Sequence, residues 1–434
     1  MKSAGADGNG FAAQPQHKQE VTMSVLSDSK QIIAAAIHAA LPDTAVEQAL
    51  EKLPEYGGRL ILIAAGKAAW QMASAAWRRL GNRISGGVVI TKYHHAQGSI
   101  GRLSIFEAGH PVPDENSYRA TQAAMDAVTG LTESDLVLFL LSGGGSALFE
   151  KPLIPPEELA EVTRQMLACG ADITEINTLR KRFSAVKGGK FAQLCAPAQV
   201  FSIVLSDILG DPLDAIASGP ASPDPTTAAQ AQAVAEKYQL TLSSNAKARL
   251  AEETPKKLDN VSSVVTGSVR QLCASASQTA AALGYKPIVL SASVCCEARE
   301  AGSFLASIAQ YHQDSQESLA FILGGETVVH LTGDGLGGRN QELALGAARG
   351  IAGMRDTLIF SIGSDGTDGP TDAAGGWADG ETINRLTQKG LCLDDVLRRN
   401  DAYSALKAID GLIITGPTGT NVNDLTVLLL KRGG

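Results

Sequence analysis

The chain has 434 residues, a length that accommodates two or three domains of ordinary size. Hydrophobic residues make up 44%, enough for sizeable cores, which excludes a mostly disordered protein. The 37 basic and 45 acidic residues give a net charge of −8, which argues against nucleic acid or an anionic membrane surface as the main partner.

Several further features predict an intracellular protein with a cytoplasmic location. No apolar run reaches the roughly 18–20 residues of a membrane span. The first 22 residues are polar and glycine-rich and lack the apolar segment of a secretory signal, so they are interpreted as part of a disordered tail. The six cysteines show no paired metal spacing, and the adjacent Cys295 and Cys296 are interpreted as ordinary reduced residues rather than as a redox or metal pair.

Short β-like apolar runs alternate with Ala-rich amphipathic stretches along the chain, which is typical of an α/β protein with parallel sheets. The runs cover residues 59–65, 87–92, 136–142, 199–206, 263–266, 287–291, 318–324, 357–363 and 412–415. Between 222 and 260 the sequence becomes polar and helical, without a strand pattern, and a new alternation follows. We therefore predict a tail at 1–30, an N-terminal α/β domain at 31–245 and a smaller C-terminal α/β domain at 246–434.

The first candidate site residue follows the first of these runs. In open α/β sheets the ligand crevice lies beyond the carboxyl ends of the strands, so residues just after a run are candidates for function. Lys67, next to Gly66, follows the run 59–65 and can supply a point charge to a phosphate or carboxylate. The segment lacks the upstream glycine and the following Ser or Thr of a P-loop. A lysine on an ordinary helix face is the alternative.

A glycine-rich loop follows the run 136–142. Three consecutive glycines before a helical stretch let backbone N–H groups close on an anion, and the flanking serine hydroxyls add donors. The candidate phosphate-binding residues are Ser142, Gly143, Gly144, Gly145 and Ser146. A tight strand-to-helix turn without a ligand is the alternative.

Two more candidates come from the next part of the chain. Arg180 belongs to a basic cluster at 180–190, which is either a solvated helix face or the positive wall of an anion pocket. Asp207 follows the run 199–206 and is placed to accept a hydroxyl proton or to orient a metal ion. Capping of a following helix is the alternative for Asp207.

The segment 333–338 contains the spacing G-x-G-x-x-G, which by itself is weak evidence for dinucleotide binding. Such a fold requires an acidic residue roughly 20 positions later, and the nearest suitable acid, Asp365, comes too late. Arg339 follows the glycines directly, and its forked guanidinium suits a phosphate or carboxylate, with Asn340 beside it. A surface arginine is the alternative.

The loop 361–372 interleaves carboxylates and hydroxyls with glycine. Such oxygen ligands suit Mg²⁺ held partly through water, and Asp365 and Asp368 are the candidate contacts. A polar loop stabilised by Asx turns is the alternative. Together, glycine-rich loops, isolated Lys and Arg residues, and aspartates are the groups that phosphoryl transfer uses for positioning and charge neutralisation.

In chain order these motifs resemble the glycerate 2-kinases whose C-terminal part is called the MOFRL domain. The resemblance runs from about residue 30 to about residue 430. It rests on seven segments: 65–70, 109–114, 141–147, 177–181, 206–220, 324–342 and 364–369.

The resemblance implies a Rossmann-like N-terminal domain, a MOFRL-type C-terminal domain and an active site in the cleft between them. It implies ATP- and Mg²⁺-dependent transfer of a phosphoryl group to the 2-hydroxyl of D-glycerate. The family's functional lysine and arginine correspond to Lys67 and Arg339, which we expect to act with Asp207 in catalysis. The expected partners are these small molecules, with a homodimer as a candidate assembly. An NAD(P)H-dependent hydroxypyruvate reductase is the alternative enzyme, and a non-catalytic anion-binding protein is a third reading.

Overall fold

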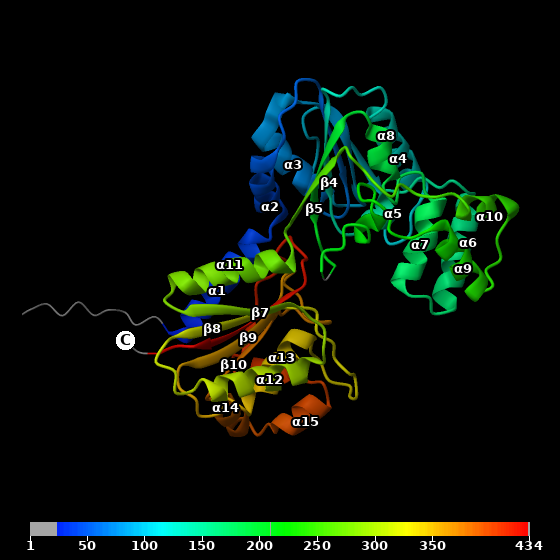
Figure 1. The fold of residues 1–434 in the computed structure, drawn as a ribbon. Coiled ribbons are helices and arrows are strands. Elements are labelled where there is room, and N and C mark those ends of the chain that lie inside the picture. The colour runs from blue at the N-terminus through cyan, green and yellow to red at the C-terminus, as the bar shows by residue number, and fades with distance from the viewer. Residues whose placement is uncertain (1–23, 209, 433–434) are drawn as a thin grey trace, which may run out of the picture.

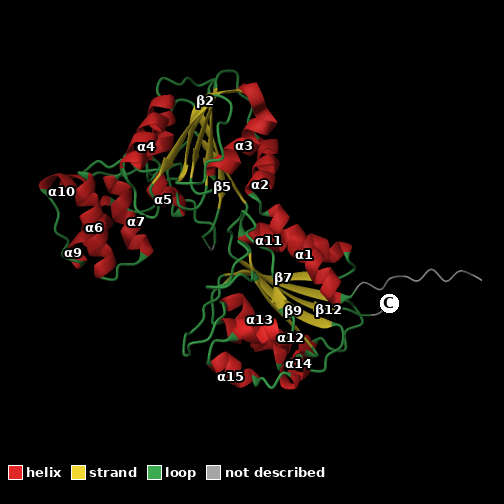
Figure 2. Ribbon diagram, turned by 180° about the vertical axis from the view of Figure 1, so that it is seen from behind, coloured by secondary structure: helices red, strands yellow, loops and turns green. Residues whose placement is uncertain are grey.

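The computed structural model describes residues 24–208 and 210–432, which form two six-stranded sheets in separate halves of the molecule (Figure 1). Helices cover both faces of each sheet, as the view from behind also shows (Figure 2). In these described ranges, no helix combines the length and the hydropathy needed to cross a membrane.

The first sheet is entirely parallel and has the strand order β3-β2-β1-β4-β5-β6. Its strands are β1 (Leu60–Ala65), β2 (Ile84–Lys92), β3 (Leu103–Ala108), β4 (Leu136–Leu141), β5 (Gln199–Leu205) and β6 (Val261–Thr266). The predicted runs match five of them within a few residues. The edge strand β3 was not predicted, because its partly exposed residues form no continuous apolar run.

Both faces of the central strands are buried, which is why these strands are apolar along their whole length. The helices α2 (Pro42–Ala49) and α3 (Ala69–Leu80) pack on one face. The other face is covered by α4 (Glu115–Ala127), α5 (Gly145–Leu148) and α8 (Lys190–Cys195). This packing holds the loops at the carboxyl ends of the strands on a rigid support.

The polar stretch 222–260 forms part of a small helical lobe. Its helices α9 (Ala228–Lys237) and α10 (Ser244–Leu250) share a core with α6 (Pro156–Ala168) and α7 (Ile173–Phe183). The chain then returns to the first sheet, where β6 pairs with β5. The first sheet therefore extends beyond the predicted boundary at 245/246, because the change in composition marks this lobe rather than the end of the sheet.

The second sheet has the order β11-β10-β9-β12-β8-β7. Its strands are β7 (Lys286–Val294), β8 (Leu319–Gly325), β9 (Thr357–Gly363), β10 (Gly375–Asp379), β11 (Leu412–Ile413) and β12 (Asp424–Leu430). Only the β7–β8 pair is parallel, and the other pairs are antiparallel. The expectation of parallel pairing is therefore wrong for most of this sheet, because apolar periodicity does not report the direction of a buried strand.

Helices also cover both faces of the second sheet. On one face lie α12 (Ala298–Tyr311), α13 (Arg339–Ala348), α14 (Thr382–Gln388), α15 (Leu393–Arg398) and α16 (Ala402–Ala408). On the other lie α1 (Val25–Ala39) and α11 (Val269–Ala282). Most of the predicted tail, residues 1–23, lies outside the described residues, whereas residues 25–30 begin α1. The described chain thus begins on the second sheet, builds the first sheet and then returns.

Candidate active site

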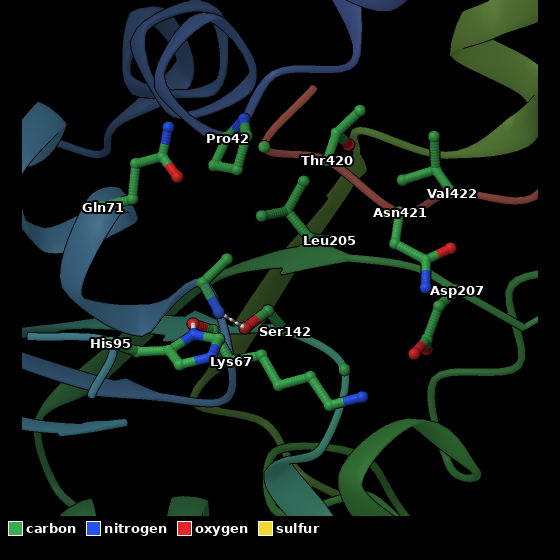
Figure 3. Close-up of a pocket in the computed structure, with 13 residues that line it drawn as sticks. Pro42, Lys67, Gln71, His95, Ser142, Leu205, Asp207, Thr420, Asn421 and Val422 are labelled. Carbon is green, nitrogen blue, oxygen red and sulfur yellow. Dashed lines mark hydrogen bonds between the residues drawn. The ribbon is translucent and has the colours of Figure 1, made fainter. Parts of the chain in front are cut away.

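The carboxyl ends of β1, β4 and β5 meet at one edge of the first sheet. The strand order reverses between β1 and β4, and such a reversal opens a crevice beyond the strand ends. A cavity of about 300 Å³ lies there, and its lining includes Lys67, Ser142 and Asp207 (Figure 3). Residues 419–422, which precede β12, form its opposite wall. The cavity therefore lies between the two halves of the molecule.

The glycines at 143–145 are required because other groups lie directly against their backbone. A side chain at Gly143 would overlap the carboxylate of Asp207. A Cβ at Gly144 would lie 3.0 Å from the His110 ring, and one at Gly145 would lie 2.7 Å from the Cβ of Ala217. The loop is thus a bare strip of backbone beside Lys67, as an anion cradle requires.

Hydrogen bonds hold the backbone of Lys67 in place, whereas its ammonium group makes no ion pair with the described residues. Its N–H donates a hydrogen bond to the carbonyl of Gly143 over 2.9 Å, and the next N–H, of Ala68, donates to the Ser142 hydroxyl over 3.1 Å. Across the described residues, none of the ion pairs involves the Lys67 ammonium. Figure 3 shows the side chain extended toward Asp207. The arrangement leaves the ammonium available to an incoming anion.

Asp207 is partly buried at the end of β5. Burial raises the pKa of its carboxyl, the nearby charge of Glu326 raises it further, and Lys67 opposes both effects. A carboxylate with a raised pKa beside a cation can accept a proton from a hydroxyl group. No regular α-helix follows Asp207 directly, so the alternative of a helix cap does not apply, and the role of Asp207 as a base stays a prediction.

Two histidines that the sequence reasoning left without a role lie beside this cradle. The Nδ1 atom of His95 is 3.1 Å from the Lys67 carbonyl oxygen. His110 lies against Gly144, and burial together with the positive charge of Lys67 lowers the pKa of its imidazole. His110 lies in the segment 109–114, one of those on which the family resemblance rests, and this membership was the feature of the sequence that could have indicated a role for it.

Arg339 lies in a second cavity, of about 790 Å³, with the glycines of 333–338 and Glu326. Its Nε and Nη2 atoms pair with the Asp424 carboxylate at 2.6 and 3.0 Å, and Nη1 lies 3.1 Å from Glu326. Burial would lower the pKa of the guanidinium, but Asp424 and Glu326 raise it above its usual range. The forked guanidinium of Arg339 is thus held in an orientation that already binds a carboxylate.

Asn340, which was predicted to bind substrate beside Arg339, does not face the cavity. Asn340 is buried and its amide is occupied at both ends, by the Asp368 carboxylate at 3.2 Å and the Ser361 hydroxyl at 2.6 Å. One residue along a helix turns the side chain by about 100°, which directs Asn340 into the core.

The two aspartates predicted as magnesium contacts have local structural roles. Asp368 is buried and accepts the N–H groups of Asn340 and Gln341 at 3.1 and 2.9 Å, so it caps the start of α13. Asp365 accepts the N–H of Thr367 at 2.9 Å, which is the Asx turn that the sequence left as an alternative. Among the described residues no group of three or more acidic, His or Cys side chains forms a metal site.

Arg180 and Ser146 lie behind the cradle rather than in it, whereas Ser142 lines the cavity. Arg180 donates to the carbonyl of Ser146 over 3.1 Å, and burial lowers the pKa of its guanidinium. The Ser146 hydroxyl is 3.2 Å from that of Ser218, and the buried Ser142 hydroxyl links the two strand ends. These contacts brace the loop, so the positive wall predicted as one alternative for Arg180 is not formed toward the cavity.

The segment before β12 supplies functional residues that the sequence reasoning missed. Asn423 donates through Nδ2 to the main-chain oxygen of Asp207 over 3.4 Å and to Glu326 over 3.2 Å. Its Oδ1 atom is buried without a hydrogen-bond partner. The next residue, Asp424, binds Arg339. Asn423 therefore links Asp207, which lines the Lys67 cavity, to Glu326, which lines the Arg339 cavity.

The G-x-G-x-x-G spacing lies in a different context from a dinucleotide site. Residues 333–338 are separated from the end of β8 by a loop, whereas the fingerprint requires glycines directly after a strand. The strand next to β8 on the β9 side is the antiparallel β12, so β8, α13 and β9 form no unit of adjacent parallel strands. Gly333 and Gly335 instead approach the backbone of residues 399–401, and Gly338 lies against Asp368.

Two families match the chain in succession. "Domain of unknown function (DUF4147)" covers residues 28–251, and the "MOFRL family" covers residues 319–424. A Thermotoga maritima protein named D-glycerate 2-kinase is 50% identical over 92% of this chain and 97% of its own. A crystal structure of a glycerate kinase from the same organism matches with a TM-score of 0.88 and 49% identity, covering 93% of this chain and 99% of that one. An Agrobacterium vitis relative, 38% identical over 92% of this chain and 93% of its own, carries the name hydroxypyruvate reductase with a qualifier marking it as provisional.

Proposed function

The chain belongs to the glycerate 2-kinases that join a DUF4147 domain to a MOFRL domain, and we propose that it transfers the γ-phosphoryl group of ATP to the 2-hydroxyl of D-glycerate, forming 2-phosphoglycerate. One observation supports the separate roles that we propose for its residues. A lysine beside a side-chain-free loop lies in one cavity, and an arginine preorganised for a carboxylate lies in another. Asn423 links a lining residue of the first, Asp207, to a lining residue of the second, Glu326. Phosphoryl transfer depends mainly on such positioning and charge neutralisation.

The cradle formed by Lys67 and Gly143–Gly145 takes the phosphate groups of ATP. The glycines place no side chain of the loop between its backbone and Lys67, whose ammonium has no ion pair among the described residues and supplies the compensating charge. Because the loop is braced from behind by Arg180, little reorganisation is needed when charge develops on the transferred group.

Arg339 takes the carboxylate of glycerate. Its guanidinium already binds one carboxylate, Asp424, through two parallel contacts, while its third contact, with the half-exposed Glu326, is the one open to exchange. The substrate carboxylate is chemically equivalent to the Glu326 side chain and replaces it at Nη1. Asp424 then serves as the support that keeps the fork oriented.

Asp207 orients the 2-hydroxyl and accepts its proton. Its carboxylate lies against Gly143 of the phosphate cradle, and its main-chain oxygen accepts a hydrogen bond from Asn423. Magnesium bound with the nucleotide would supply charge neutralisation. Among the described residues that line the cavity, Asp207 is the carboxylate that would hold such an ion, since Asp365 and Asp368 are engaged in structural hydrogen bonds.

A cytoplasmic location and a homodimer are parts of the same proposal. The small-molecule substrates follow from the kinase activity of the family. The reductase alternative is not favoured, since the only segment proposed for a dinucleotide lies outside the strand–turn–helix context that such binding requires.

The test is to incubate the purified protein with ATP, Mg²⁺ and D-glycerate and to identify the product by NMR. Coupling to enolase separates 2-phosphoglycerate from its 3-isomer, since only the former is dehydrated. We expect 2-phosphoglycerate, formed only with Mg²⁺ present. Consumption of NADH with hydroxypyruvate, without any phosphorylated product, would refute the proposal.

A further inference from the structure

A cavity of about 700 Å³ lies between α1 and β11, the strand at one edge of the second sheet. Ligand pockets usually have volumes of about 300–1,000 Å³, so this cavity has the size of a small-molecule site. None of the described residues that line it also lines the Lys67 cavity or the Arg339 cavity. Its lining is mainly apolar and includes Ile33, Ile37, Trp377, Leu412 and Ile413. We call it the α1–β11 cavity.

The two titratable residues in this lining, Lys30 and His38, are both basic. They lie on the same side of α1, about 12 Å apart at about 1.5 Å per residue, with the exposed Ala34 midway between them. No ion pair of the described residues includes either side chain, and no described acidic residue lines the cavity. An apolar cavity with an unpaired positive charge at its rim is complementary to an anion that carries an apolar group.

The connection from α1 to α2 forms part of the wall between this cavity and the Lys67 cavity. Helix α1 ends at Ala39 and α2 begins at Pro42, and the two helices pack in different halves of the molecule (Figure 1). Leu41 lines the α1–β11 cavity, and the next residue, Pro42, lines the Lys67 cavity. Consecutive residues of one short connection therefore line different cavities.

The segment before β12 forms a second part of the same wall. Thr418 lines the α1–β11 cavity, and Gly419 beside it lines the Lys67 cavity. The buried Thr420 hydroxyl donates a hydrogen bond to the main-chain oxygen of Ala40 over 2.7 Å, which ties this segment to the connection between α1 and α2. A displacement of the wall therefore reaches both cavities, because closely packed segments transmit strain.

We propose that the α1–β11 cavity is a regulatory site for a small aromatic anion, a carboxylate or sulfonate, and that its occupancy weakens binding in the Lys67 cavity. The aromatic ring packs against Trp377 and the apolar side of α1, and the anionic group lies at Lys30. Because the two cavities share a wall, a ligand that widens the first moves this wall toward the second. The coupling rests on the proposed function, under which the Lys67 cavity takes ATP.

The probe is anilinonaphthalene sulfonate, an aromatic anion whose emission rises in apolar surroundings and is excited by energy transfer from a nearby tryptophan. We titrate the full chain without nucleotide and expect one bound probe per chain. Lys30→Glu should weaken binding about tenfold or more, because a repelling charge replaces an attracting one. Lys52→Glu is the matched control, since Lys52 is also exposed but lies in the other half of the molecule. Unchanged affinity in Lys30→Glu would overturn the proposal.

Further variants, each checked for folding by circular dichroism, locate the probe. Ala34→Trp fills the cavity from an exposed position of α1 and should abolish binding, whereas Ala229→Trp, at an exposed position of α9, should not. Trp377→Phe keeps an aromatic ring and should retain binding but lose most of the energy transfer, while Trp77→Phe should keep both. Full energy transfer in Trp377→Phe would put the probe elsewhere. Binding per chain that falls as protein concentration rises would show the cavity covered by a second copy. Either result would overturn the proposal.

The coupling is measured with ATP. Because linkage is reciprocal, the probe should raise the dissociation constant of ATP, and ATP that of the probe, by the same factor of about five or more. In Ala34→Trp the probe should leave the affinity for ATP unchanged. Equal affinity for ATP with and without the probe, or a displacement that grows without limit as in direct competition, would overturn the regulatory role. A chain that does not bind ATP would refute the proposed function and the coupling with it, whereas the titration without nucleotide tests the probe site independently.

Discussion

The side-chain amide of Asn423 donates a hydrogen bond to the main-chain oxygen of Asp207 over 3.4 Å, and so connects the segment before β12 with the end of β5. The same nitrogen lies 3.2 Å from Glu326, the exchangeable partner of Arg339. One side chain thus sets the position of the proposed base relative to the proposed carboxylate site. Residues from both sheets must keep this relationship for the hydroxyl group to meet the phosphate.

The first prediction concerns this connection. Asn423 has a φ of 69°, so Asn423→Gly removes the amide while keeping the backbone conformation free of strain. We expect kcat to fall by about 10- to 100-fold with a smaller change in the KM for ATP, because misplacement of reacting groups costs rate rather than nucleotide binding. Steady-state kinetics measure this. Asn384→Gly, on the surface helix α14, tests for a general effect of the substitution, and an unchanged kcat in Asn423→Gly would contradict the positioning role.

Lys67→Met should remove the charge of the phosphate cradle. Because the Lys67 ammonium has no ion pair within the described chain, the free energy of unfolding should change by no more than about 0.5 kcal/mol. We expect kcat/KM to fall by orders of magnitude. Lys257→Met is the matched control, since that lysine is 80% exposed and remote from the cavity. Activity close to wild type in Lys67→Met would remove the lysine from the mechanism.

Gly143→Ala tests the bare backbone of the loop. The added methyl group would overlap the Asp207 carboxylate, so either the loop or Asp207 must move. We expect kcat to fall about 100-fold or more, since a displacement of about 1 Å has this effect on positioned groups. Gly57→Ala serves as the comparison, because a Cβ there has no atom within 4 Å. Equal kinetics in the two variants would show that the contact is unimportant.

Arg339→Lys keeps the charge and loses the fork. The bidentate contact with Asp424 cannot form, and we expect the KM for glycerate to rise and kcat/KM to fall about 10- to 100-fold, as for the loss of one or two charged hydrogen bonds. The KM for ATP should change less. Arg349→Lys, where the arginine pairs with Asp394 on the exposed surface, should behave as wild type. A selective loss of ATP affinity in Arg339→Lys would reverse the assignment of the two cavities.

The last prediction is a pH dependence of stability. Burial raises the pKa of the Asp368 carboxyl to about 6, with Asp424 adding to the effect. The folded state therefore binds this proton more tightly than the unfolded chain does, so the contribution of Asp368 to stability falls as pH rises from about 4 to about 6. Its full size is about 3 kcal/mol. Chemical denaturation of the wild type and of Asp368→Asn across this range measures it: the wild type should lose stability relative to the variant as the pH rises. A constant difference would show that the pKa is not raised.

The sequence by itself determined the features that depend on local pattern. The apolar runs predicted most strands of the first sheet, because strands buried on both faces must be apolar along their length. The residues at their carboxyl ends, Lys67, the glycines of the loop and Asp207, then fell together in one crevice, as the geometry of a parallel sheet requires.

Only the tertiary structure decided what depends on contacts between distant segments. Asn340 follows Arg339 directly, yet the turn of the helix buries it, and Asp368 caps that helix from 28 residues away. The segment ending in Asn423 and Asp424 carries no strong local motif and gains its role because β12 inserts between β8 and β9. The sequence pattern indicates which side chains are buried or polar. Which of these side chains meet at a site depends on which strands lie next to each other in the sheet.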